Sequence, residues 1–176
     1  MGEHVRDLSK SRIWGANLLI LVLLGTHELQ FTRLLKMVED CIDRGIIKEK
    51  VIAQVGNTKY ESDKMEIIKY LGYSEMESLI ADADFILTHG GTGSIVTSLR
   101  YQKKVVAIPR LKKYNEHNDD HQGEILNVLQ EEGHIVVYEE HDDLGKRILE
   151  LESFTPKPFS LDNHLMLNII RDFITK

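Results

Sequence analysis

Disulfide chemistry and an excess of positive charge are both missing from this sequence. Its 176 residues include a single cysteine, and 22 lysines and arginines stand against 28 aspartates and glutamates, for a formal net charge of −6. Cys41 lies at helical spacing from Val38 and Met37, which predicts a buried, inert thiol and not a nucleophile. The lone thiol is consistent with a reducing, cytoplasmic location, and the charge disfavours nucleic acid as a partner.

Long apolar runs, internal repeats and low-complexity tracts are absent as well. The longest apolar run, 18–24, is far short of the roughly 20 residues that a membrane-spanning helix needs. No small-residue cleavage site follows it, so a signal peptide is a poor fit. A short run bounded by Gly25 instead predicts a central parallel strand that is covered on both faces.

The chain does contain short apolar runs that alternate with amphipathic stretches over residues 18–176. This pattern is typical of βαβ units and predicts a single Rossmann-like α/β domain with a mostly parallel sheet. Residues 1–17 are polar without a clear period, and we expect a poorly ordered leader there. The expected strands are 18–24, 50–55, 66–70, 84–88, 105–108 and 135–138, and the expected helices are 29–44, 74–81, 93–101, 122–132, 142–151 and 161–174.

The loops that follow the expected strands are where a ligand should bind, because open parallel sheets hold ligands beyond the carboxyl ends of their strands. Three of these loops carry unusual residues: 25–28, 89–94 and 109–122. The second loop contains Gly90, Gly91 and Gly93 and leads into a helix. Glycines allow the backbone to approach an anion closely, and the N–H groups of a helix N-terminus favour phosphate.

This glycine loop lacks the features of two common nucleotide sites. It has no third glycine of the G-x-G-x-x-G fingerprint, no acidic residue at the end of the next strand about 20 residues on, and no P-loop lysine. A Rossmann dehydrogenase and an NTPase are therefore both disfavoured. A purely structural turn is the alternative to an anion site.

The loop 109–122 is long, polar and rich in hydrogen-bond donors, which is typical of functional loops. Arg110 and the two lysines after it suit a phosphate or an acidic partner, or a solvated face. His117 and His121 with two aspartates between them resemble a metal site. However, no third ligand set has clear spacing and helix capping explains the acids, so we expect no metal.

His27 follows the first expected strand. An imidazole at a strand end suits a general base for an acceptor hydroxyl, or a donor to a phosphate or sugar oxygen. The alternative is a histidine that only caps or stabilises its loop.

Several motifs occur in order between about residues 18 and 138. They are GTHELQF at 25–31 with RL at 33–34, ADFILTHGGTGSI at 83–95, KKVVAIPR at 103–110 and EHNDDHQ at 116–122. Together they resemble the soluble subunit of two-component UDP-sugar glycosyltransferases. This family includes the cytosolic partner of the eukaryotic enzyme that adds the second N-acetylglucosamine to dolichol diphosphate, and bacterial subunits for exopolysaccharide and capsule synthesis.

The resemblance implies a fold like the C-terminal half of a GT-B glycosyltransferase, with a UDP-sugar lying across the strand ends. Its diphosphate would lie at the glycine loop, and His121 and Gln122 would reach the ribose or the sugar. The residues expected to bind the donor are Gly25, Thr26, His89, Gly90, Gly91, Thr92, Gly93, Ser94, Arg110, His121 and Gln122, with His27 as the candidate base. No cofactor is implied, since backbone amides and a helix dipole can offset the charge of the leaving diphosphate.

The resemblance also implies a partner, a membrane-anchored subunit that binds a lipid-linked glycan acceptor at the cytoplasmic face of the membrane. Many relatives place an acid three positions after the motif serine to bind the ribose hydroxyls, and this chain has Thr97 there. That departure favours bacterial exopolysaccharide or capsule synthesis.

The expected function is therefore inverting transfer of a hexose or N-acetylglucosamine from UDP to a lipid-linked glycan, in a complex with the partner. One alternative is a non-catalytic enhancer subunit of such a transferase, and another is a UDP-sugar epimerase-like enzyme. Apolar surface that awaits the partner could also drive homo-oligomer formation in isolation.

Overall fold

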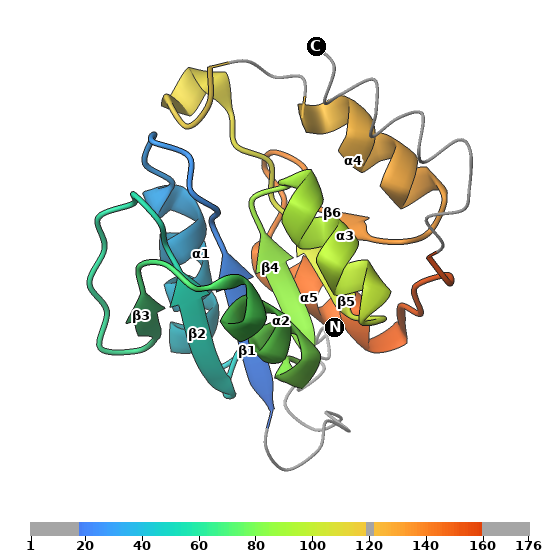
Figure 1. The fold of residues 1–176 in the computed structure, drawn as a ribbon, viewed down its shortest axis with the longest axis horizontal. Coiled ribbons are helices and arrows are strands. Elements are labelled where there is room, and N and C mark those ends of the chain that lie inside the picture. The colour runs from blue at the N-terminus through green and yellow to red at the C-terminus, as the bar shows by residue number, and fades with distance from the viewer. Residues whose placement is uncertain (1–17, 119–121, 160–176) are drawn as a thin grey trace, which may run out of the picture.

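Parallel strands form a single sheet in this computed structural model, which describes residues 18–118 and 122–159. The strands are β1 (Leu19–Leu23), β2 (Lys50–Gln54), β3 (Glu66–Ile68), β4 (Phe85–Thr88), β5 (Lys104–Ala107) and β6 (Val136–Val137). Every pairing between neighbours is parallel, in the order β3-β2-β1-β4-β5-β6 (Figure 1). The prediction of an α/β domain with a parallel sheet is confirmed. The expected leader 1–17 and the expected helix 161–174 lie outside the described residues.

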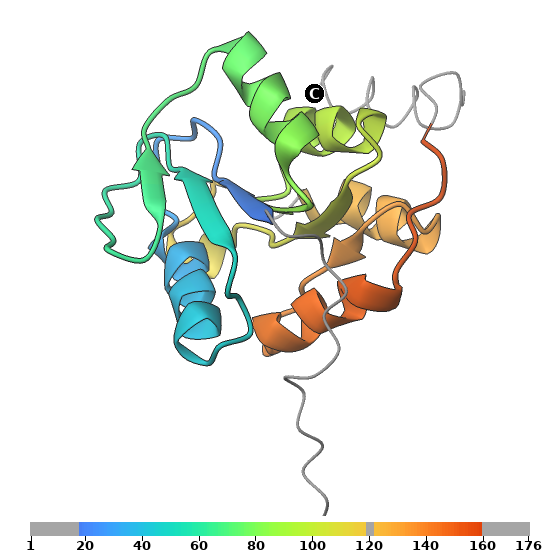
Figure 2. The ribbon, with the colours of Figure 1, turned by 90° about the horizontal axis from the view of Figure 1, so that it is seen from below.

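Helices cover both faces of the sheet. They are α1 (Thr32–Asp43), α2 (Tyr73–Asp82), α3 (Thr92–Arg100), α4 (Gln122–Glu131) and α5 (Leu144–Ser153), with a short 3-10 turn η1 (Lys112–Tyr114). Figure 2 shows α2 and α3 on one side of the sheet and α1 and α5 on the other. Within the described residues, no helix is long and apolar enough to cross a membrane.

The start of α1 differs from the expectation of residue 29, because the preceding residues are held in a loop. The N–H group of Phe31 donates to the hydroxyl of Thr58 at 3.1 Å, and the carbonyl of Leu29 accepts from Arg110 at 2.9 Å. Helical spacing of apolar residues cannot reveal such contacts between segments that are distant in sequence. The helix therefore begins at Thr32.

Alternate side chains of β1 enter two different halves of the core. Ile20, Val22 and Leu24 pack on the side of α1 and α5, whereas Leu21 and Leu23 pack on the side of α2, α3 and α4. None of these five side chains is exposed. Burial of each contributes about 1.5–3 kcal/mol. The apolar run at 18–24 is thus a central strand covered on both faces, as predicted.

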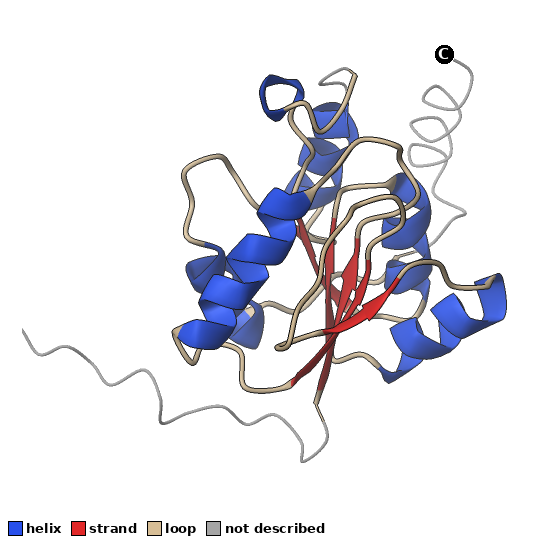
Figure 3. Cartoon of the chain, turned by 90° about the vertical axis from the view of Figure 1, so that its left-hand side faces the viewer, coloured by secondary structure: helices blue, strands red, loops and turns tan. Residues whose placement is uncertain are grey.

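The loops after β1, β4 and β5 gather at one edge of the sheet, because parallel strands all end at the same side (Figure 3). The strand order reverses between β1 and β4, which leaves their ends side by side. The N–H group of His89, just after β4, donates to the carbonyl of Leu23 in β1 at 3.0 Å. This reversal is where ligands of open α/β sheets bind.

Candidate functional site

A cavity of about 420 Å³, here named the strand-end pocket, opens at the reversal between β1 and β4. Its lining comes from the loops after β1 and β4, the end of β2, the segment after β3 and the facing sides of α2 and α3. The lining residues are Gly25, Thr26, Gln54, Tyr70, Leu71, Tyr73, Met76, Glu77, Ile80, His89, Gly91, Gly93, Ser94 and Thr97. Of the residues expected to bind the donor, six therefore line one cavity, namely Gly25, Thr26, His89, Gly91, Gly93 and Ser94.

The glycine loop presents the start of α3 to this pocket. Gly91 is the N-cap residue and has no side chain to cap the helix, so the first backbone N–H groups of α3 are left for a ligand. A Cβ atom on Gly91 would lie 2.3 Å from Nε2 of His89, whereas a Cβ atom on Gly93 would meet nothing within 4 Å. A side chain at position 91 would therefore clash with His89, whereas Gly93 borders open space.

The turn after β1 is held by Gln54, a residue that the sequence analysis missed. The amide of Gln54 accepts from the N–H group of Gly25 at 3.1 Å and donates to its carbonyl at 3.0 Å. Gly25 has a φ of +70°, and its carbonyl comes so close to Gly56 that a Cβ atom there would lie 2.1 Å away. The available signal in the sequence was a glutamine directly after the apolar residues Val51, Ile52 and Ala53, and the structure buries it at 2% exposure.

His89 forms an inner wall of the pocket. Its Nδ1 lies 3.0 Å from the carbonyl of Leu23, which makes Nδ1 the protonated nitrogen of the neutral ring. Burial lowers the pKa of His89 to about 4, and the nearby charge of Arg110 adds to the effect. The ring is therefore neutral at physiological pH and shapes the turns at Gly25 and Gly91.

His27 and His117 come together from two different loops. Their ring centroids are 4.8 Å apart, and the N–H group of Leu29 donates to Nδ1 of His27 at 3.1 Å. A neutral ring that accepts at Nδ1 carries its proton on Nε2. His27 therefore stabilises its own loop, which was the structural alternative considered above, and it does not line the strand-end pocket.

Arg110 does not occupy the place expected of a phosphate ligand. Its side chain is 2% exposed and donates to the backbone carbonyls of Leu24, Leu29 and Glu116 at 2.9, 2.9 and 3.1 Å. Its guanidinium also lies 4.7 Å from the ring centroid of Phe31. Burial lowers the pKa of Arg110 to about 10, so the group keeps its charge at neutral pH. Its structural role is to tie the loops after β1 and β5 together.

The loop after β5 is fixed further by Glu116. This buried carboxylate accepts two hydrogen bonds from Arg33, at 2.9 and 2.8 Å, and one from the N–H group of Leu111 at 3.0 Å. Lys113 forms an ion pair with Glu140. Of the other predicted residues in this segment, His121 lies outside the described residues, and Gln122 begins α4.

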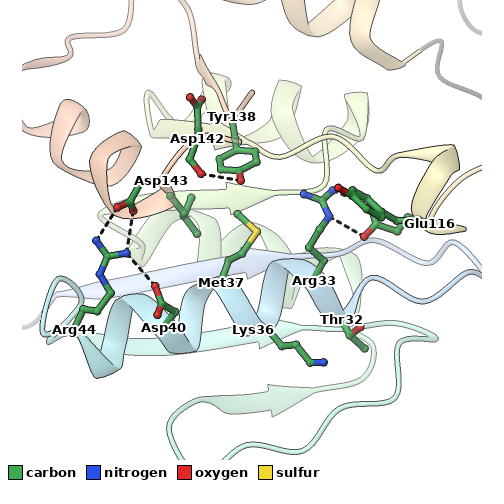
Figure 4. Close-up of a pocket in the computed structure, with 12 residues that line it drawn as sticks. Thr32, Arg33, Lys36, Met37, Asp40, Arg44, Glu116, Tyr138, Asp142 and Asp143 are labelled. Carbon is green, nitrogen blue, oxygen red and sulfur yellow. Dashed lines mark hydrogen bonds and ion pairs between the residues drawn. The ribbon is translucent and has the colours of Figure 1, made fainter. Parts of the chain in front are cut away.

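A second cavity, of about 700 Å³ and here named the helix groove, lies between α1 and the start of α5 (Figure 4). Its lining residues are Thr32, Arg33, Lys36, Met37, Asp40, Arg44, Tyr114, Glu116, Tyr138, Asp142, Asp143 and Leu144. Arg44 pairs with Asp40 at 3.0 Å and with Asp143 at 2.7 Å. Figure 4 shows Asp40 on α1 and Arg44 at its C-cap, with Arg44 reaching across to Asp143. The groove contains none of the residues predicted to bind the donor.

No cluster of three or more histidine, cysteine, aspartate or glutamate side chains that could hold a metal ion occurs in residues 18–118 and 122–159. The expectation that the site works without a metal remains a prediction, because three members of the motif at 116–122 that raised the question, Asp119, Asp120 and His121, fall outside the described residues.

Solved structures with a similar fold include several glycosyltransferases. The glycosyltransferase of kitacinnamycin aligns with 87% of this chain and 39% of its own, with a TM-score of 0.57 and 21% identity. The solution structure of ALG13 aligns with 82% of this chain and 90% of its own, with a TM-score of 0.51 and 20% identity. The UDP-GlcNAc 2-epimerase of Methanocaldococcus jannaschii shares the fold too, with a TM-score of 0.56 and 15% identity over 93% of this chain and 47% of its own.

Sequence relatives carry one name, UDP-N-acetylglucosamine transferase subunit ALG13. The protein of Cryptococcus neoformans is 25% identical over 122 residues, which is 69% of this chain and 58% of that protein. The protein of Debaryomyces hansenii is 28% identical over 72 residues, 39% of this chain and 34% of that protein. The chain thus spans between about one third and three fifths of the length of these relatives.

The model of the glycosyltransferase family 28 C-terminal domain matches residues 19–175, nearly the whole chain. The matched span includes all the lining residues of the strand-end pocket, and the fold is similar to those of the solved glycosyltransferases. This chain therefore belongs to the family defined by the C-terminal domain of glycosyltransferase family 28.

Proposed function

We propose that this chain binds the UDP-sugar donor of a glycosyl transfer reaction in the strand-end pocket. The observation that carries the proposal is the uncapped N-terminus of α3, which opens into the pocket through Gly91, Gly93 and Ser94 where the strand order reverses. Backbone N–H groups and the positive end of a helix dipole favour a diphosphate there. The name of the fungal relatives supports UDP as the nucleotide and N-acetylglucosamine or another hexose as the sugar.

The proposed reaction is a single displacement with inversion at the anomeric carbon. An acceptor hydroxyl attacks that carbon and loses its proton to a base, while UDP leaves with the electron pair of the bond that breaks. The N–H groups at the start of α3 stabilise the charge that develops on the diphosphate, so the proposal needs neither a metal nor another cofactor.

The hydrogen bond of His27 favours one of its two expected roles in this reaction. A base must offer an unprotonated nitrogen, but Nδ1 of His27 already accepts the N–H group of Leu29. That bond favours a donor role for Nε2, toward a phosphate or sugar oxygen, over the role of base. His27→Gln keeps a hydrogen-bond donor and should retain most of the UDP affinity, whereas His27→Ala should weaken UDP binding. If both variants bind UDP like the wild type and both fail in transfer, His27 is the base.

We place the acceptor on a second polypeptide. The relatives are named as subunits, which supports a site that is completed by a partner. The proposed partner is anchored in the membrane and presents a lipid-linked glycan at the cytoplasmic face, in exopolysaccharide or capsule synthesis. In the alternative function, the chain only enhances a catalytic partner and turns nothing over.

Calorimetric titration with UDP and with UDP-sugars, with and without magnesium, tests the donor site. Gly93→Asp places a carboxylate in the open space where we expect the diphosphate, and it should weaken UDP binding at least about 30-fold through charge repulsion. Gly123→Asp is the matched control, because Gly123 is also in the first turn of a helix and a Cβ atom there also meets nothing within 4 Å. Equal UDP affinity in the two variants would contradict the proposed site.

The same variant separates the two functions. Transfer by the co-expressed pair should be lost in Gly93→Asp if this chain holds the donor. Transfer that survives this change, in a pair that still assembles, favours the enhancer.

A further inference from the structure

One face of α2 forms a second wall of the strand-end pocket. Tyr73, Met76, Glu77 and Ile80 all line the cavity, at the i, i+3, i+4 and i+7 positions that share one side of a helix. Ile80 is fully buried, while Tyr73 is 68% exposed. The wall therefore runs from the core to the rim of the pocket, and none of its residues belongs to the predicted donor site.

Glu77 is the one acidic residue among the described residues that line this pocket. Its side chain is half-buried, and Oε1 accepts a hydrogen bond from the hydroxyl of Tyr73 at 3.0 Å. An ionised carboxylate can accept about four hydrogen bonds, so this contact uses a small part of its capacity. Tyr73 thereby holds the carboxylate in one position at the pocket wall.

Other polar side chains of the pocket are occupied by the protein backbone. The hydroxyl of Thr97 donates to the carbonyl of Gly93 at 2.9 Å, inside its own helix. Gln54 is paired with Gly25, and Nδ1 of His89 with Leu23. Glu77 is consequently the strongest side-chain acceptor that the pocket offers to a bound molecule.

We propose that Glu77 binds the ribose diol of the donor nucleotide and that Tyr73 is its positioning residue. The inference rests on the proposed function, which puts the diphosphate at the start of α3. A phosphate would be repelled by Glu77, so the part of the ligand beside it must be neutral and rich in donors. A vicinal diol has that chemistry, because its two hydroxyls can donate to the two oxygens of one carboxylate.

The rim beside Glu77 suits the nucleoside better than the sugar. Tyr70 and Tyr73 line this end of the pocket and are 50% and 68% exposed. Tyr70 is held in place by a hydrogen bond of 2.6 Å from its hydroxyl to Asn57, which in turn donates to the carbonyl of Thr26 at 2.9 Å. Exposed aromatic rings offer a surface on which a base can stack.

Three ligands, UDP, 2′-deoxy-UDP and inorganic pyrophosphate, test this assignment by calorimetry on the full chain. The wild type should prefer UDP to 2′-deoxy-UDP by about tenfold, the value of one hydrogen bond to a charged group. Glu77→Gln should weaken UDP by about tenfold and reduce that preference to less than about twofold. It should bind pyrophosphate at least as tightly as the wild type, because it removes a charge that repels phosphate. Tyr73→Phe should weaken UDP by about threefold, since it removes only the positioning bond.

Asp82→Asn is the control, because Asp82 is an exposed acid on the same helix that does not line the pocket. It should behave like the wild type with all three ligands. The inference is overturned if Glu77→Gln keeps the preference of the wild type for UDP, or if it weakens pyrophosphate as much as UDP. A folded wild-type chain that binds no UDP, alone or with its partner, overturns the proposed function and this inference with it.

Discussion

The strand-end pocket and the helix groove differ in what their polar groups do. In the helix groove, most charged side chains pair with one another, as Arg33 does with Glu116 and Arg44 with Asp143. In the strand-end pocket, buried polar side chains hold loops in shape, and residues at the uncapped start of α3 line the cavity. The groove is the larger of the two, at about 700 Å³ against about 420 Å³.

The difference shows that cavity size is a poor guide to function here. Charges that are already neutralised by fixed partners have little left to offer a ligand, and these pairs connect α1 to the loop after β5 and to the N-cap of α5. The first N–H groups of an uncapped helix have no intrahelical partner and can bind an anion. The smaller cavity is therefore the better candidate site, and the following variants test this contrast, from the largest expected effect to the smallest.

Arg110→Met should break the connection between the two regions. The guanidinium of Arg110 bonds to Leu24, next to the pocket, and to Glu116, which lines the groove. The substitution leaves two buried carbonyls and one partly buried carbonyl without this donor, and we expect a loss of about 4 kcal/mol in the free energy of unfolding by urea. Arg100→Met, at an exposed position, should change it by less than about 0.5 kcal/mol. Similar losses in both variants would contradict the role assigned to Arg110.

The pH dependence of stability should identify His89 as part of the pocket wall. Its pKa is lowered from 6.5 to about 4 by burial, so the unfolded chain binds more protons than the folded one between these values. Stability is therefore complete above about pH 6.5 and falls as the pH drops toward 4, by about 3 kcal/mol at most. Urea unfolding at several pH values should show this loss in the wild type and a smaller one in His89→Gln. Identical pH profiles would mean that the ring is not buried as described.

Two alanine substitutions in the glycine loop should have opposite signs. Gly91→Ala brings a Cβ atom against His89 and should destabilise the fold by about 2 kcal/mol. Gly93→Ala enters open space at a helical position and should stabilise the fold by about 0.5 kcal/mol. Thermal unfolding of both variants measures the difference. A loss of stability in Gly93→Ala would show that Gly93 is packed and does not border the cavity.

The ion pair of Arg44 with Asp143 should contribute least. These side chains are 44% and 31% exposed, and a double-mutant cycle to alanine should give a coupling free energy of about 0.5 kcal/mol that decreases in high salt. UDP affinity should be unchanged in each single variant, because neither residue lines the strand-end pocket. A marked loss of UDP binding would instead assign the helix groove to the donor.

The parallel sheet and most of the glycine loop were predictable from local patterns. The run at 18–24 indicated a strand buried on both faces, and Gly90, Gly91 and Gly93 after a strand indicated a turn into a helix. Those features depend on composition and spacing within about ten residues. The start of α1 was wrong by three residues, since contacts of residues 29–31 with Thr58 and Arg110 come from other parts of the chain.

The positions of Arg110 and Gln54 at the site could not be predicted from local sequence patterns. Arg110 is a basic residue in a polar loop, which suggested that it binds phosphate. Gln54 carried no local pattern that indicated a role. The structure buries both and uses them to fix neighbouring backbone. Whether a polar side chain faces solvent or a carbonyl depends on which strand ends adjoin, and no local pattern reports that.

The sequence by itself determined the class of this protein: the order of its elements, its parallel sheet and the family to which its motifs belong. Hydrophobic periodicity and glycine placement act over short distances, so they can be read along the chain. Only the tertiary structure decided which residues share the pocket, because the strand order places the ends of β1 and β4 together and sets α2 beside α3. That arrangement made Glu77 a candidate binding residue, because what a carboxylate can bind depends on the groups that surround it in space.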